Sequence, residues 1–187
     1  MIWNIPNLLT VLRIVLIPVF VLVFFSPYSW ANIASTAIFG LAALTDWLDG
    51  YLARRLKQLS VFGAFLDPVA DKLMVAVALV LLVQDNPTMV FAIPAAVIVG
   101  REIAISALRE WMSEIGERTK VKVSVIGKVK TIAQMVSILL LLFKTPIGPF
   151  PTHDVGMILI YVAAVLTLWS MIVYMRAAWP VIVGNSS

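Results

Sequence analysis

Six apolar segments, each long enough to cross a lipid bilayer, constrain the fold of this chain more than any other feature. A helix needs about 20 residues to span the hydrocarbon layer. Segments of that kind lie near residues 4–25, 31–57, 61–83, 87–111, 125–143 and 155–178. Only 13% of the residues are charged, whereas a soluble domain averages about 25%. The sequence therefore predicts an all-α integral membrane protein with six transmembrane helices, in which residues 1–187 form a single transmembrane domain.

The basic residues predict which side of the membrane each end of the helices faces. Six spans place both termini on the same side. Most basic residues belong to that side or its interface, namely Arg54, Arg55, Lys57, Arg109, Arg118, Lys120, Lys122 and Arg176. Lys144 alone falls in a loop on the opposite side. Because positively charged loops stay in the cytoplasm, we expect both termini to be cytoplasmic. The basic residues are not interleaved with exposed aromatic residues, so nucleic acid is not an expected partner.

Four aspartates lie where the second and third apolar segments meet the cytoplasmic side. Each residue of a helix turns by about 100°, so Asp46 and Asp49 share one face of the second helix. Asp67 and Asp71 are four residues apart and share one face of the third helix. The second segment ends, and the third begins, at the short connection 58–60. The spacing therefore predicts one acidic pocket at the cytoplasmic ends of the second and third helices.

Carboxylates that lie this close together require compensating positive charge. An ionised aspartate near the bilayer centre costs about 2.5–3.5 kcal/mol, and neighbouring carboxylates also repel one another. Carboxylate oxygens are the natural ligands of Mg²⁺ and Mn²⁺, and two divalent ions balance four negative charges. Two divalent metal ions side by side can hold a phosphoryl group during its transfer. The chain has no cysteine, which excludes thiolate metal sites.

The residues between the aspartates fit a phosphate ligand. Gly50 and Gly63 leave space for a bulky ligand beside the backbone, and Arg54 can bind a phosphate oxygen. Helix packing explains each glycine equally well when it is taken alone. Helix capping, or an ion pair with a nearby basic residue, likewise explains any single aspartate. These simpler explanations do not account for the spacing of the whole set.

The residues from Asp46 to Asp71 match the pattern D-x2-D-G-x2-A-R-x8-G-x3-D-x3-D without a departure. This pattern is the signature of the CDP-alcohol phosphatidyltransferase family, which the chain resembles over its whole length. Three further segments, residues 4–10, 101–110 and 127–131, resemble the bacterial phosphatidylglycerophosphate synthases of that family. The resemblance rests mainly on the aspartate signature, which is highly specific.

The resemblance implies an activity and a set of roles. The reaction transfers the phosphatidyl group of CDP-diacylglycerol to sn-glycerol 3-phosphate and releases CMP. Two Mg²⁺ or Mn²⁺ ions are held by the four aspartates, and Asp71 also takes the proton of the acceptor hydroxyl. Gly50, Arg54 and Ser60 match positions that contact the cytidine diphosphate. The resemblance further implies a homodimer in the bacterial cytoplasmic (inner) membrane, with the active site facing the cytoplasm.

The acceptor carries a phosphate dianion, so the site needs basic residues that an uncharged alcohol does not require. The candidates lie at cytoplasmic helix ends and are Arg101, Arg109, Lys128 and Lys130, with Thr10 and Arg13 as weaker candidates for lining the headgroup site. The positive-inside bias alone also explains Arg109 and the two lysines. An ion pair with Glu102 or with a neighbouring helix also explains Arg101. Arg118, Lys120 and Lys122 more plausibly attract anionic membrane lipids, by about 1 kcal/mol each.

Other functions stay open from the sequence. A transporter can use membrane carboxylates to relay cations or protons, although here the carboxylates cluster at one interface. A membrane prenyltransferase also binds metal and diphosphate through paired aspartate motifs, but it lacks the G-x2-A-R continuation. Another family member with a different acceptor alcohol is the nearest alternative. A purely structural membrane protein leaves the aspartate spacing unexplained.

Overall fold

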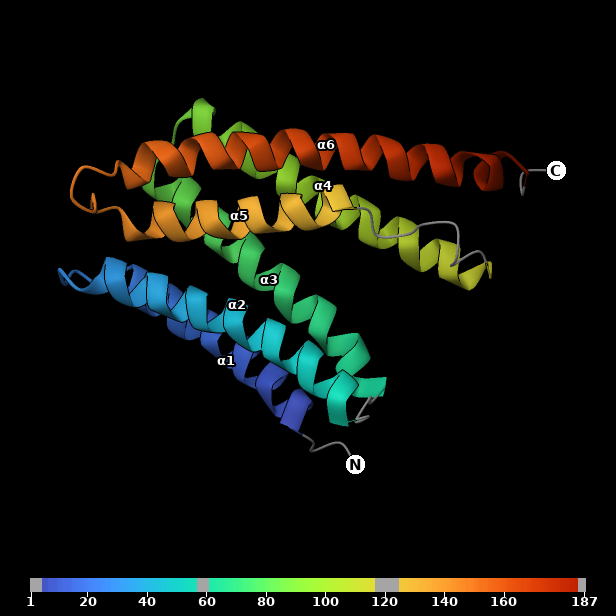
Figure 1. Ribbon diagram of the computed structural model, residues 1–187, viewed down its shortest axis with the longest axis horizontal. Coiled ribbons are helices and arrows are strands. Elements are labelled where there is room, and N and C mark those ends of the chain that lie inside the picture. The colour runs from blue at the N-terminus through green and yellow to red at the C-terminus, as the bar shows by residue number, and fades with distance from the viewer. Residues whose placement is uncertain (1–4, 57–60, 117–124, 185–187) are drawn as a thin grey trace. The chain divides into compact units, whose positions relative to one another are not determined.

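The protein is all-helical throughout the part of the chain that the structure describes. The computed structural model describes the backbone of residues 5–56, 61–116 and 125–184. Within these ranges it also describes the side chains, except those of residues 5–6, 47, 49–56, 61–62, 64–65, 67, 125–126, 128 and 184. Within these ranges there are six α-helices: α1 (Ile5–Phe24), α2 (Ala31–Leu56), α3 (Val61–Asp85), α4 (Met89–Glu114), α5 (Val125–Phe143) and α6 (Thr152–Gly184). Figure 1 shows them in chain order, from blue to red. The predicted succession of six helices is confirmed.

The helices differ from the apolar segments mainly at their ends. The fourth helix begins at Met89 and not at Pro87, after Thr88 with an extended backbone (φ −109°, ψ 147°). The sixth helix extends the apolar segment in both directions, from Thr152 to Gly184. Asp154 lies in its first turn, where a carboxylate interacts favourably with the helix dipole. A membrane-spanning helix can therefore be longer at both ends than its apolar segment.

Three helices of the described chain are long and apolar enough to cross a membrane, namely those containing Asn7–Phe24, Met89–Glu114 and Thr152–Val183. A shorter apolar helical stretch covers Val129–Phe143. Many large apolar side chains on these helices point outward, among them Leu22, Ile103 and Val165. Exposed apolar surface of this extent is what lipid contact requires, because acyl chains are as apolar as leucine. The protein is therefore a multi-pass membrane protein.

The chain divides into two compact units. The first contains Met1–Asn86 together with Ile138–Asp154, and the second contains Pro87–Ser137 together with Val155–Ser187. In the first unit α1 packs against both α2 and α3, and α2 also contacts α3. The rings of Phe20 on α1 and Phe39 on α2 lie 6.3 Å apart in its interior. Each of the two units is compact in itself, and the single domain stays a prediction.

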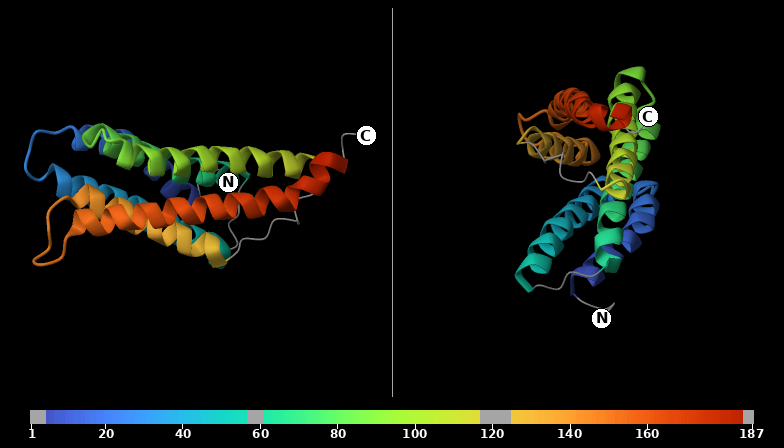
Figure 2. Two further views of the ribbon diagram at one scale, coloured as in Figure 1. Left: turned by 90° about the horizontal axis from the view of Figure 1, so that it is seen from above. Right: turned by 90° about the vertical axis from the view of Figure 1, so that its right-hand side faces the viewer.

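Polar contacts connect the helices of the second unit. Tyr161 on α6 donates a hydrogen bond from its hydroxyl to the carbonyl of Val90 on α4 (2.6 Å). Ser137 on α5 donates to the carbonyl of Gly156 on α6 (2.7 Å). Hydrogen bonds of this kind between membrane helices contribute about 0.6 kcal/mol each. Figure 2 shows the beginning of α5 running alongside α6 in both views.

Candidate active site

The first group of candidate residues lies in the unit formed by α1, α2 and α3. Arg13 on α1 donates a hydrogen bond from Nη1 to Oδ1 of Asp46 on α2 over 2.9 Å. The Arg13 side chain is 1% exposed, whereas that of Asp46 is 41% exposed. The other carboxylate oxygen of Asp46, Oδ2, has no partner among the described side chains. A buried guanidinium thus supports one side of a carboxylate whose other side remains available to a ligand.

The other members of the aspartate motif lie on α2 and α3 as predicted. Asp71 is partly exposed on α3, one residue after Ala70, which is fully buried. Gly63 is buried near the beginning of the same helix. The helices also include Asp49, Gly50, Arg54 and Asp67, whose side chains lie outside the described set, as does all of Ser60. Continuous helices confirm that each pair of aspartates shares one face, since their spacings of three and four residues lie on one side of a helix.

The four motif aspartates are the candidate ligands of the predicted pair of divalent ions. Among the side chains that the structure describes, no three histidine, cysteine or acidic groups come together as a metal site. Two of the four predicted ligands, Asp49 and Asp67, lie outside that set, so the metal site remains a prediction. An all-oxygen set of carboxylates suits Mg²⁺ or Mn²⁺. The hydrogen bond from Arg13 would orient Asp46 if Asp46 binds an ion, as outer residues of metal sites orient their ligands.

The weaker candidates of α1 are buried residues. Thr10 is fully buried, one turn before Arg13, and Asn7 another turn earlier is 3% exposed. Because these residues are spaced by three, they lie on one face of α1, the face that carries the Arg13–Asp46 pair. The guanidinium of Arg13 contacts a motif carboxylate, and the prediction that Arg13 and Thr10 line the headgroup site stays a prediction.

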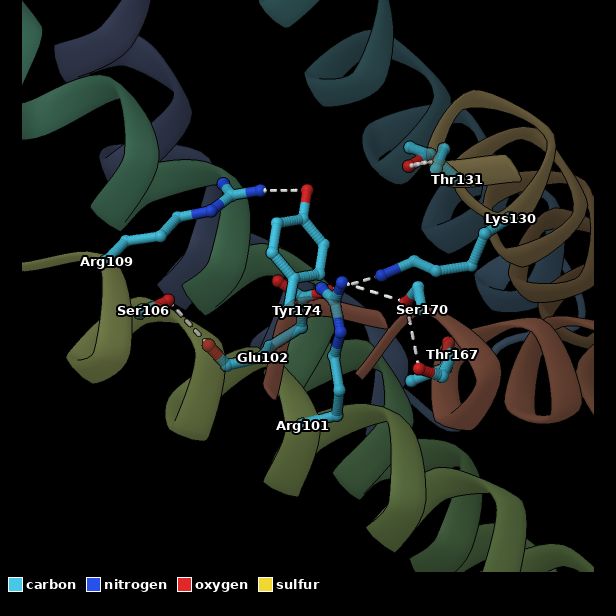
Figure 3. A network of polar contacts seen from close by, with 10 residues as sticks. Arg101, Glu102, Ser106, Arg109, Lys130, Thr131, Thr167, Ser170 and Tyr174 are labelled. Carbon is cyan, nitrogen blue, oxygen red and sulfur yellow. Dashed lines mark hydrogen bonds and ion pairs between the residues drawn. The ribbon is translucent and has the colours of Figure 1, made fainter. Parts of the chain in front are cut away.

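The second group of candidate residues lies in the unit that contains α4, the beginning of α5 and α6. Arg101 donates a hydrogen bond from Nη1 to Oε1 of its neighbour Glu102 (3.0 Å), and Lys130 on α5 donates to the same oxygen (2.5 Å). The side chains of Arg101 and Lys130 are 8% and 6% exposed, and that of Glu102 is 25% exposed. The expected Arg101–Glu102 ion pair is confirmed. One carboxylate therefore joins two buried cations from different helices (Figure 3).

Two residues of α6, Ser170 and Tyr174, complete this group. Arg101 donates from Nη2 to the hydroxyl of Ser170 (2.9 Å), which in turn donates to the carbonyl of Thr167 (2.9 Å). Arg109 donates from Nη2 to the hydroxyl oxygen of Tyr174 (2.7 Å). Figure 3 shows Arg101 and Arg109 on either side of the Tyr174 ring. Sequence reasoning missed both α6 residues.

A sequence signal for the α6 residues does exist. Thr167, Ser170 and Tyr174 recur at spacings of three and four in a helix that is otherwise strongly apolar. Such spacing places them on one face, and polar residues within a membrane helix face the protein interior. The signal identifies the face that meets other helices. It does not identify which residues they meet.

Of the remaining predicted acceptor residues, Arg109 and Lys130 belong to this group, whereas the side chain of Lys128 lies outside the described set. The predicted residues thus separate into two groups. The aspartates and Arg13 form one in the first unit, and Arg101, Arg109 and Lys130 form the other in the second unit. We refer to the second group, together with Glu102, Ser170 and Tyr174, as the basic cluster.

The chain matches the sequence profile of the CDP-alcohol phosphatidyltransferase family over residues 3–169. It belongs to that family. The matched region contains the whole aspartate motif, Arg13 and the α4 and α5 residues of the basic cluster. It ends just before Ser170.

Curated relatives match the chain over nearly its whole length. A protein of Pseudomonas fluorescens is 56% identical over 178 residues, which cover 95% of this chain and 91% of the relative. A protein of Yersinia pestis (strain Pestoides F) is 55% identical and one of Salmonella paratyphi A is 54% identical, each covering 94% of this chain and 95% of the relative. All three are named CDP-diacylglycerol–glycerol-3-phosphate 3-phosphatidyltransferase.

Proposed function

We propose that this chain transfers the phosphatidyl group of CDP-diacylglycerol to sn-glycerol 3-phosphate, giving phosphatidylglycerophosphate and CMP. The observation that carries the proposal is the identity of 54–56%, over at least 91% of each relative, to three proteins that bear the name of this activity. The matching segments include both groups of candidate residues. The chain is therefore a phospholipid-synthesising transferase.

The proposed reaction is a phosphoryl substitution. A hydroxyl oxygen of glycerol 3-phosphate attacks the phosphorus that carries the diacylglycerol, the bond from that phosphorus to the bridging oxygen breaks, and CMP leaves with this oxygen. Asp71 accepts the hydroxyl proton. Such transfers depend on positioning and on neutralising the charge of the phosphates, with little need for covalent catalysis. Gly50, Arg54 and Ser60 bind the cytidine diphosphate in this scheme.

Two Mg²⁺ or Mn²⁺ ions are the proposed cofactors, held by Asp46, Asp49, Asp67 and Asp71. When bound, such ions supply positive charge to both the attacking and the leaving oxygen. The contribution of this chain is to hold the ligands in place. Arg13 does so for Asp46 through the 2.9 Å hydrogen bond to Oδ1, which leaves Oδ2 for an ion.

The acceptor phosphate is the proposed ligand of the basic cluster and of Lys128. Arg101, Arg109 and Lys130 bring three positive charges, and Glu102 is the carboxylate that pairs with two of them. The basic cluster without Lys128 is thus left with two positive charges, as many as the negative charges of a phosphate dianion, for which arginine offers paired donors. A neutral acceptor alcohol would leave this charge uncompensated.

The proposed setting is the bacterial inner membrane. The helices of the described chain support several spans, and the positive-inside rule supports six spans with both termini and the active site on the cytoplasmic side. Membrane lipids surround the apolar helix faces. A homodimer is proposed from the family resemblance.

A panel of acceptors tests the proposed function. Purified protein receives CDP-diacylglycerol, Mg²⁺ or Mn²⁺ and one of four compounds: glycerol 3-phosphate, serine, inositol phosphate or phosphatidylglycerol. We expect CMP release with glycerol 3-phosphate alone. Release with a different acceptor would reassign the substrate within the family. Ion flux through vesicles containing the protein, without CMP release, would instead support a transporter.

A further inference from the structure

Tyr174 of α6 contacts two arginines of α4 at once. Arg101 and Arg109 are eight residues apart, and their Cζ atoms lie 5.5 Å and 5.0 Å from the centre of the Tyr174 ring. Both distances fall within the range of about 6 Å in which a cation is attracted to an aromatic ring. The two arginines thus share one neutral side chain as a common contact (Figure 3).

Hydrogen bonds orient the two arginines in addition to the attraction by the ring. Tyr174 is 8% exposed, and its hydroxyl oxygen accepts a hydrogen bond from Arg109. Ser170, one turn earlier on the same face of α6, accepts one from Arg101. Each arginine is therefore held by a residue of α6 through one Nη atom. A guanidinium carries five N–H groups, so most donors of each arginine are not used by these two bonds.

The remaining donors point to an anionic ligand. The Nε atom of Arg101 is buried and has no hydrogen-bond partner among the described residues. A buried donor without a partner costs about 1–3 kcal/mol. Glu102 balances part of the charge, since it pairs with Arg101 and Lys130. Arg109 forms no ion pair with a carboxylate among the described side chains. A phosphate supplies both the missing charge and several acceptor oxygens.

We propose that Tyr174 is a positioning residue that sets the preference for a phosphorylated acceptor. It holds the guanidinium groups of Arg101 and Arg109 through the contacts with its ring and hydroxyl, so that their remaining donors can serve the acceptor phosphate, and Ser170 fixes Arg101. This inference rests on the proposed function, whose acceptor is glycerol 3-phosphate. Ser170 and Tyr174 both lie beyond residue 169, where the match to the family profile ends.

The competing explanation is that Tyr174 only ties α6 to α4. The chain offers a matched control for this role, because Tyr161 on the same helix also bonds to α4, through the carbonyl of Val90 (2.6 Å). Tyr161 contacts no arginine among the described residues and is 40% exposed. Substitution at Tyr161 therefore reports the effect of losing an α4–α6 contact alone.

The test compares Tyr174→Leu and Tyr174→Phe with Tyr161→Leu and Tyr161→Phe in the purified full-length protein. The measured quantities are kcat, the KM of each substrate and the melting temperature with and without inorganic phosphate. We expect Tyr174→Leu to raise the KM of glycerol 3-phosphate by about tenfold, because a desolvated cation–ring contact is lost. The KM of CDP-diacylglycerol stays the same. Tyr174→Phe keeps the ring and raises the acceptor KM by about threefold.

The stabilisation by phosphate gives a second readout that does not depend on turnover. Inorganic phosphate is expected to raise the melting temperature of the wild type and of both Tyr161 variants, and to raise that of Tyr174→Leu much less. If Tyr174→Leu does not fold, Tyr174→Phe is tested against Arg109→Ala in a double-mutant cycle. The loss of the hydroxyl should then have no further effect once Arg109 is absent.

Two results would overturn the inference. One is an equal change in both KM values for Tyr174 and Tyr161 variants, which identifies a structural tie only. The other is phosphate stabilisation that is the same in wild type and Tyr174→Phe, together with additive effects in the cycle. Failure of the wild type to release CMP with glycerol 3-phosphate would contradict the proposed function instead, and the phosphate stabilisation would still decide the role of Tyr174.

Discussion

The Arg13–Asp46 pair of the first group and the Glu102 ion pairs of the basic cluster both join opposite charges, but they do so differently. In the first, buried Arg13 supports Asp46, whose side chain is 41% exposed. In the second, Glu102 is the more exposed partner and joins two buried cations, Arg101 and Lys130. In the Arg13–Asp46 pair the carboxylate is thus the more exposed partner. In the basic cluster the cations Arg101 and Lys130 are buried, and residues of α6 orient the two arginines.

This difference predicts that substitutions in the two groups of residues change different properties of the protein. In the proposed reaction, loss of a motif carboxylate removes a ligand of the ions that hold the phosphates, so the rate should collapse. Loss of a member of the basic cluster should weaken the binding of one substrate and lower stability. The substitutions below test this difference, from the largest expected effect to the smallest.

Asp71→Asn should abolish most of the activity. The substitution keeps the size of the side chain but removes both the proton acceptor and one negative charge of the proposed metal site. General bases contribute about 10²–10⁴-fold to a rate, so we expect CMP release to fall by at least about 10²-fold. The measurement is kcat at saturating substrates. An unchanged melting temperature with the rate lost supports the assignment, whereas a rate near that of the wild type contradicts it.

Arg13→Ala should weaken metal binding. Residues that orient a metal ligand typically contribute 10–100-fold to metal affinity, and Arg13 holds Asp46 at 2.9 Å. We expect the Mn²⁺ concentration for half-maximal binding, measured by electron paramagnetic resonance of free Mn²⁺, to rise by about 10–100-fold.

Arg13→Lys is the control for this prediction, since it keeps the charge but offers a single donor group. It should fall between wild type and Arg13→Ala. Equal Mn²⁺ binding by all three proteins would show that Arg13 only packs against α2.

Glu102→Gln should lower stability more than it lowers the rate. The change leaves Arg101 and Lys130 without their shared carboxylate, and buried charged groups that lose a partner destabilise by about 1–3 kcal/mol. The expected readout is a lower melting temperature that inorganic phosphate restores in part, because phosphate replaces the missing negative charge. A variant as stable as the wild type, with no added response to phosphate, would show that Glu102 does not hold the cluster together.

The helices and the aspartate faces could be predicted because both depend on local pattern. Continuous apolar residues predicted α2 from Ala31 and α3 from Val61, and the structure confirms both beginnings. The contacts of Arg13 and Tyr174 could not be predicted, because periodicity identifies the face of a helix but not its partner. Arg13, a candidate for lining the headgroup site, meets Asp46, which is 33 positions away. Tyr174 lies 65 positions from Arg109.

The central claim is that the basic cluster serves the acceptor and the aspartate motif serves the nucleotide. Arg109→Ala and Lys130→Ala test it most directly, through the KM of both substrates measured in one assay of CMP release. We predict that each raises the KM of glycerol 3-phosphate by about tenfold and leaves that of CDP-diacylglycerol unchanged. An unchanged acceptor KM in both variants, or an equal rise in both constants, would contradict this division of roles.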